Sequence, residues 1–79
     1  MKIFLLLSLW FSLVFAAVNI NKANSAQLQT LSGIGPTKAQ AIIQYRKSHG
    51  GFKNVNELGN VKGIGPKTLQ KLKRDITVR

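Results

Sequence analysis

The sequence contains no cysteine, only two acidic residues and a single histidine. Without cysteine the chain has no disulfide framework, no thiol nucleophile and no thiolate ligand for a metal. Two carboxylates and one imidazole do not form a cluster with the ligand spacing of a zinc or calcium site. The serines and threonines are scattered and lack a partnered base. The composition therefore argues against an enzyme, and we expect neither a metal nor a cofactor.

Most of the charged residues are basic. Lysine and arginine number 12 in a chain of 79 residues, which gives a formal net charge of +10. So large a charge on so small a body favours a polyanionic partner, either a nucleic acid or an anionic membrane surface. The length allows one small domain, and without disulfides its stability must come from helix packing.

The N-terminus is distinct in composition from the rest of the chain. Met1-Lys2 precedes an apolar run from Ile3 to Val18, which is shorter than the about 20 residues that a membrane span needs. Small residues around Ala16 complete the pattern of a secretory signal peptide. We expect residues 1–16 to be a signal peptide cleaved near Ala16, and residues 17–79 to be the exported domain. An uncleaved membrane anchor is the less favoured alternative.

A tetrapeptide, Gly-Ile-Gly-Pro, occurs twice, at Gly33–Pro36 and at Gly63–Pro66. Around it, Leu28–Ile43 and Leu58–Lys73 align with six of sixteen positions identical. The apolar residues keep helical spacing on both sides of each turn, which predicts a short helix, a hairpin and a second helix in each unit. Neither unit can bury its apolar face alone, so we expect the two copies to pack on each other.

Capping signals divide these units into helices. Asn24 with Gln27, and Asn54 with Glu57, match the capping-box pattern at the start of a helix. We expect the first helix to extend through Leu28 and Leu31 to Ser32-Gly33. The second helix should run from Pro36 to Gly50-Gly51, where glycine takes the left-handed conformation that ends a helix. The last helix should begin at Pro66. No alternating strand pattern follows Val18, so the fold class is all-α, with four to five short helices.

The apolar positions of these helices define an expected core. Its members are Leu28, Leu31, Ile34, Ala39, Ile42, Ile43, Phe52, Val55, Leu58, Val61, Ile64, Leu69 and Leu72, with Ile76 also facing inward.

The two turns carry the candidate site. Glycines permit a positive φ and close approach of a ligand, and amides at the start of a helix point outward toward an anion. Nearby lysines add charge and threonines add hydroxyl donors, while the two isoleucines are expected to turn back and hold the loop shape. The candidate DNA-binding residues are Gly33, Ile34, Gly35, Thr37, Lys38, Lys62, Gly63, Ile64, Gly65, Lys67 and Thr68. Contacts of this kind read the nucleic-acid backbone, so we expect little sequence preference and a strong salt dependence.

The first unit resembles the helix-hairpin-helix motif at every apolar, glycine and alanine slot. The second unit departs from it at Leu69, where alanine is usual, and at Lys73, where an apolar residue is usual. An apolar leader, the segment Val18–Ala23 and then a tandem pair of motifs resemble the ComEA family of competence DNA receptors, over essentially all of Val18–Val78.

This resemblance implies a tandem, (HhH)2-type domain that places one hairpin on each strand of duplex DNA. It also implies a periplasmic protein that binds incoming double-stranded DNA and hinders its return during natural transformation. The implied partners are an outer-membrane pore, inner-membrane DNA channel components and further copies of the protein along the DNA.

Other interpretations remain open at this point. A helix-hairpin-helix module can serve protein–protein interaction in an uptake or secretion complex, and a cationic chain can act on membranes, although the many caps and turns favour a fixed fold. Tyr45 and Arg46 are able to approach a nucleic-acid backbone, but we favour a structural role, in which Tyr45 covers the helix surface and Arg46 packs its stem on Phe52. His49 lies at a helix end, where a satisfied or solvent-facing role is favoured over a catalytic one.

Overall fold

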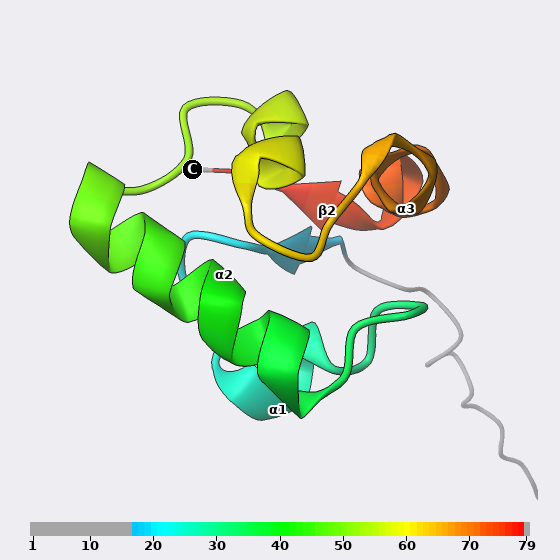
Figure 1. Cartoon of the computed structure of the whole chain (residues 1–79), viewed down its shortest axis with the longest axis horizontal. Helices are drawn as coiled ribbons and strands as arrows, with labels where there is room; N and C mark the ends of the chain where they lie inside the picture. The colour runs from blue at the N-terminus through cyan, green and yellow to red at the C-terminus, as the bar shows by residue number, and fades with distance from the viewer. Residues whose placement is uncertain (1–16, 79) are drawn as a thin grey trace, which may run out of the picture.

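The computed structural model describes residues 17–78. The predicted signal peptide, residues 1–16, lies outside the described residues, as does Arg79. Two short strands, β1 (Val18–Asn19) and β2 (Ile76–Thr77), flank the helical part of the fold. The helical elements in chain order are α1 (Ser25–Leu28), α2 (Pro36–His49), the 3₁₀ helix η2 (Val55–Asn60), α3 (Pro66–Leu72) and the 3₁₀ helix η3 (Lys73–Asp75). The predicted helical fold is therefore confirmed over the described range, and the two strands are an addition to it (Figure 1).

The helix α1 begins at its predicted cap and ends earlier than predicted. The Asn24 side chain accepts the Gln27 amide at 2.8 Å, and the Gln27 side chain accepts the Asn24 amide at 2.8 Å, so the capping box is present. The predicted end at Ser32-Gly33 is wrong, because the helix stops at Leu28. Beyond it, the Thr30 amide and hydroxyl both donate to the Gln27 carbonyl, at 3.2 and 2.6 Å. This local side-chain bond competes with the helical ladder and closes the chain into a tighter turn.

The helix α2 has the predicted bounds. Pro36 occupies its first turn, and Gly50 ends it in the left-handed conformation with φ 73°. The Gly51 amide then donates to the Arg46 carbonyl at 2.8 Å, which satisfies one of the last helical carbonyls. Arg46, Lys47 and His49 lie in the last turn, where positive charge is favourable.

The prediction of a second capping box at Asn54 and Glu57 is wrong. The Asn54 side chain makes no capping bond, and the segment that follows is a 3₁₀ helix. Its first turn is closed instead by the backbone, with the Glu57 amide donating to the Asn54 carbonyl at 3.2 Å. The segment includes Gly59, which disfavours an α-helix, and it leads directly into the second turn.

One buried core joins both units. Ten of the predicted core residues are buried, while Ile43, Val55 and Leu69 are half-buried and pack against them. The structure adds Ile20 and Ala23, which sequence patterning missed because they lie in an irregular segment, and it confirms the inward position of Ile76. The N-terminal segment is thus part of the core.

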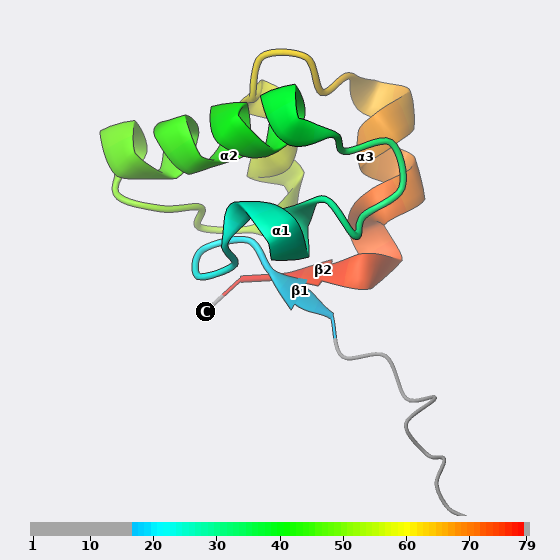
Figure 2. The same cartoon turned by 90° about the horizontal axis from the view of Figure 1, so that it is seen from below.

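The two chain ends of the domain pair as parallel strands. Val18 is in register with Ile76, and Asn19 with Thr77. The Ile20 amide extends the pairing by donating to the Thr77 carbonyl at 3.0 Å. Figure 2 shows β1 and β2 side by side beneath the helices. The sequence after Val18 did not indicate these strands, because strands of two residues are too short to show an alternating pattern.

Side chains fasten the segment after β1 to the end of α2. The Arg46 Nη1 donates to the carbonyls of Ile20 and Ala23 at 3.0 and 2.7 Å. The Asn21 Nδ2 donates to the Phe52 carbonyl at 3.0 Å, and its Oδ1 accepts the Phe52 amide at 2.6 Å. We call these four bonds the N-terminal clasp. They give Arg46 the structural role that the sequence favoured, with backbone carbonyls as its partners.

The clasp generates a stability prediction. Asn21→Ala removes both side-chain partners of the partly buried Phe52 backbone, so we expect a loss of about 1–3 kcal/mol in the free energy of unfolding. Urea denaturation followed by circular dichroism measures it. Asn56→Ala, at an exposed position of η2, is the matched control and should change stability by less than about 0.5 kcal/mol. Equal stability of the two variants would contradict the role of the clasp.

Candidate nucleic-acid interface

The two Gly-Ile-Gly-Pro turns fold into hairpins with the same backbone. In each hairpin three amides donate in turn to carbonyls three, three and four residues earlier in the chain. The bonds in the first are Leu31 to Leu28 (3.1 Å), Ile34 to Leu31 (3.1 Å) and Ala39 to Gly35 (2.9 Å). Their counterparts are Val61 to Leu58 (3.1 Å), Ile64 to Val61 (3.0 Å) and Leu69 to Gly65 (3.0 Å). The repeat seen in the sequence is therefore a repeat of hydrogen bonding.

The first glycine of each hairpin is required by the fold. Gly33 has φ 80° and Gly63 has φ 92°, a conformation that residues with a Cβ adopt only with strain. The isoleucines that follow, Ile34 and Ile64, are buried at 4% exposure each. As predicted, their side chains turn back into the core, so they shape the hairpins and leave only their backbone near the surface.

The second glycine of each hairpin is not required by the fold. Gly35 (φ −94°, ψ −170°) and Gly65 (φ −94°, ψ −179°) are extended residues at the N-caps of α2 and α3. Any residue type adopts this backbone, and a Cβ at either position would meet nothing within 4 Å. An N-cap normally favours Ser, Thr, Asp or Asn, whose side chains bind the first helical amides. Neither helix has such a side-chain cap. The glycines therefore leave space and donors unoccupied.

Those donors are backbone amides that face away from the helices. Within residues 17–78, the amides of Gly35, Thr37 and Lys38 have no acceptor, and neither do the equivalent amides in the second hairpin, those of Gly65, Lys67 and Thr68. Pro36 and Pro66 contribute no amide. The predicted donors are thus brought together at each hairpin, where the positive end of a helix adds to their attraction for an anion.

Lysines lie where the helices themselves disfavour them. Lys38 is in the first turn of α2 and Lys67 in the first turn of α3, and neither turn contains an acidic residue. A cation at a helix N-terminus opposes the helix dipole, by about 0.3–1 kcal/mol at an exposed site. Lys62 is exposed just before the second turn. Positive charge, free amides and the helix dipole all point to the same ligand, an anion.

Lys38 connects the hairpins in a way that spacing does not reveal. Its Cγ and Cε lie 3.7 and 3.8 Å from the point that a Cβ would occupy at Gly63. The side chain therefore starts in the first hairpin and lies across the turn of the second. In the sequence Lys38 belongs to the first hairpin, and no residue pattern indicates the crossing, because it depends on how the two units pack.

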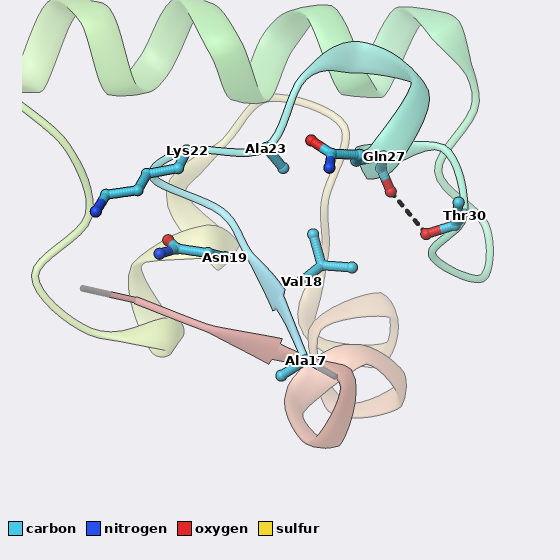
Figure 3. A pocket seen from close by; sticks show the side chains of 7 residues that line it. All are labelled: Ala17, Val18, Asn19, Lys22, Ala23, Gln27 and Thr30. Carbon is cyan, nitrogen blue, oxygen red and sulfur yellow. Dashed lines mark hydrogen bonds between the residues drawn. The ribbon is translucent and has the colours of Figure 1, made fainter. Parts of the chain in front are cut away.

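A separate pocket lies between β1 and α1 (Figure 3). Asn19, Lys22, Gln27 and Thr30 line it together with small apolar side chains, and Thr30 is bonded to the Gln27 carbonyl there. None of the predicted site residues lines this pocket. Over residues 17–78 there is also no group of three or more His, Asp and Glu side chains able to hold a metal ion. In the same range, no helix has the length and hydropathy to cross a bilayer.

Comparison with known families identifies the repeat. A family model for the helix-hairpin-helix motif matches residues 15–77, which is most of the chain. The chain belongs to the helix-hairpin-helix family. The matched range spans both hairpins and the β1 segment, so this helix-hairpin-helix domain includes the N-terminal clasp.

Related helix-hairpin-helix proteins differ in length. ComE operon protein 1 of Bacillus subtilis is 48% identical over 64 residues, covering 81% of this chain and 31% of that protein. A Haemophilus influenzae protein named only as uncharacterized is 51% identical over 55 residues, covering 68% of this chain and 49% of that protein. The match to the Bacillus protein confirms the ComEA-type resemblance. The chain spans less than half the length of both relatives.

A third relative carries an enzyme name. The human endonuclease/exonuclease/phosphatase family domain-containing protein 1 is 41% identical over 61 residues, covering 77% of this chain but only 11% of that protein. The shared part is the length of one helix-hairpin-helix domain, so this match points to the domain that both chains contain.

The different demands on the paired glycines predict opposite effects on stability. Gly33→Ala with Gly63→Ala should lower the free energy of unfolding by about 1–2 kcal/mol for each substitution, because both positions have positive φ. Gly35→Ser with Gly65→Ser should leave stability unchanged or raise it, because serine is a favourable N-cap. Thermal unfolding of the two double variants measures the contrast, and an equal loss of stability in both would contradict this division of roles.

Proposed function

We propose that this protein binds double-stranded DNA without sequence preference, one hairpin to the backbone of each strand. The observation that carries the proposal is the pair of N-cap glycines, Gly35 and Gly65, where the fold alone would favour a capping side chain. Glycine is tolerated at an N-cap, but in the free protein it provides no side-chain acceptor for the first helical amides. It has a benefit if a phosphate oxygen occupies the place of the missing cap and accepts the free amides.

The chemistry of the hairpins favours phosphate over base edges. Backbone amides and lysine ammonium groups bind phosphate oxygens in any sequence, whereas base recognition uses side chains that reach into a groove. Thr37 and Thr68 stand two and three residues after the two N-cap glycines and can add hydroxyl donors. Because Lys38 lies across Gly63, charge gathers at the second hairpin, and the first relies more on its neutral amides.

The likeness to ComE operon protein 1 supports a role in competence. We propose that the protein is an exported, periplasmic receptor that holds incoming DNA and hinders its return during uptake. An outer-membrane pore, inner-membrane channel components and further copies along the DNA are the partners that this role requires. The apolar residues 3–16 support export, and N-terminal sequencing of the exported protein tests it. The expected first residue is Ala17, and a chain that retains Met1 would contradict cleavage.

The helix-hairpin-helix match and the ComE likeness point to binding and not to catalysis. A pure protein–protein interaction module is the alternative. Such a module requires neither lysines in the first turns of α2 and α3 nor N-caps without a side chain. The two functions are separated by whether the protein binds naked duplex.

Duplex binding should depend on the empty N-caps. Fluorescence anisotropy with a labelled duplex of arbitrary sequence measures it. Gly35→Ser with Gly65→Ser places a hydroxyl on the amides that a phosphate would use, so we expect at least about a tenfold loss of affinity. Gln40→Ala with Gln70→Ala is the matched control, because these exposed residues occupy equivalent positions in the two units. Unchanged affinity in the serine variant would contradict the hairpin mechanism.

The salt dependence of the same titration tests the electrostatic part of the proposal. If four to six phosphates are neutralised, the slope of log K against log salt should be about −4 to −5. Lys38→Ala should reduce its magnitude by about 0.9, while Lys47→Ala, at the far end of α2, should not. A flat dependence would favour the interaction module.

A further inference from the structure

Three aromatic rings form a column at the C-terminal end of α2. The ring centroids of Tyr45 and Phe52 are 4.9 Å apart with an interplanar angle of 18°, and those of Tyr45 and His49 are 3.9 Å apart at 12°. Phe52 is buried, Tyr45 is half-buried and His49 is exposed. The column therefore runs from the core to the surface and ends in an imidazole ring.

The outer ring is stacked on Tyr45, and its residue is exposed. The His49 Nδ1 lies 3.0 Å from the Tyr45 carbonyl oxygen, and the Asn60 Nδ2 contacts the Tyr45 hydroxyl at 3.4 Å. Hydrogen bonds and stacking therefore limit the movement of this exposed ring. A flat, fixed π-surface of this kind requires no ordering when another ring stacks on it.

Exposed lysines are next in sequence to residues of the N-terminal clasp and of the column. The N-terminal clasp joins Asn21 to Phe52, and it joins Arg46 to Ile20 and Ala23. Lys22, Lys53 and Lys47 are each adjacent in sequence to a residue of the clasp, and all three are exposed. Of the two acidic residues, Glu57 belongs to η2, the element whose Asn60 contacts Tyr45, and Asp75 belongs to η3. The clasp thus joins three chain segments that each contain an exposed lysine.

This surface is separate from the hairpins. The 14 residues of α2 span about 20 Å, with the first hairpin at one end and His49 at the other. Figure 2 shows the C-terminal end of α2 pointing away from the loop that joins α1 to α2. At physiological salt the Debye length is about 8 Å, so the lysines at the two ends act on different ligand segments.

We propose that the His49 column, with Lys47 and Lys53, is a binding site for single-stranded DNA. A base stacks on the exposed ring of His49, and the flanking phosphates meet the lysines. A single strand is the favoured occupant because only an unpaired base can present its face, while bases inside a duplex are already stacked. The proposal goes beyond duplex binding at the hairpins and does not depend on it.

The test uses a short single strand, oligo(dT), and an abasic oligonucleotide of equal length that keeps the phosphates without the bases. Titrations by fluorescence anisotropy use the purified Gly35→Ser/Gly65→Ser protein, in which the hairpin donors are blocked. His49→Ala in this background should lower the affinity for oligo(dT) about tenfold, the scale of one lost base stack. It should leave the affinity for the abasic strand unchanged.

Two control variants make the result specific. Ser48→Ala changes an exposed neighbour on the same helix turn and should alter neither titration. His49→Phe keeps a ring on the column and should retain the binding of oligo(dT). If His49→Ala also unfolds the protein, His49→Phe still decides the question, because a folded variant that loses oligo(dT) binding contradicts stacking. Two results would overturn the proposal. One is that the protein with His49 present binds oligo(dT) and the abasic strand with equal affinity, and the other is that His49→Ala has no effect.

Failure here is distinguishable from failure of the proposed function. With the hairpins unaltered, His49→Ala should leave duplex affinity within twofold of the parent protein. Loss of oligo(dT) binding with duplex binding intact supports the proposal. A protein that binds oligo(dT) through His49 but no duplex would contradict only the hairpin function.

Discussion

The structure depends on one small core to which both hairpin units and the N-terminal segment contribute. The largest fully buried side chains are Leu28 and Ile42 from the first unit, their counterparts Leu58 and Leu72 from the second, and Ile20 from the segment after β1. A domain this small without disulfides cannot bury enough apolar surface in either half alone. The two units fold by packing on each other, and Ile20 reaches the core because β1 and the clasp hold its backbone in place.

This mutual packing explains why the two hairpins are alike in backbone and unlike in charge. Equivalent core residues hold the chain before and after each turn in the same way. The equivalent glycines therefore take the same backbone conformation in both hairpins. The surface is free of that constraint. Lys38 crosses to the second turn, Lys62 precedes it and Lys67 follows it, so the charge is unequal while the hydrogen bonding is repeated.

The same packing gives the molecule two different ends. At one end of α2 the chain leaves amides unpaired and cations unneutralised, at some cost to the free protein. At the other end the clasp satisfies backbone groups of Ile20, Ala23 and Phe52, and the aromatic rings stack beside it. The free amides and lysines at the hairpins suggest a binding surface because they lack partners within the described residues. The aromatic column suggests one only through the exposure of His49.

The sequence by itself determined the helical class, the bounds of α2 and most of the core, because helical spacing, caps and turn glycines act within a few residues of each other. It also predicted the hairpin residues as a candidate site, since their pattern is local and repeated. Only the tertiary structure decided what depends on contacts between distant segments. The pairing of β1 with β2, the burial of Ile20 and Ala23, the partners of Arg46 and the crossing of Lys38 all join residues far apart in the chain. No local periodicity records such contacts, because they exist only once the two units have packed.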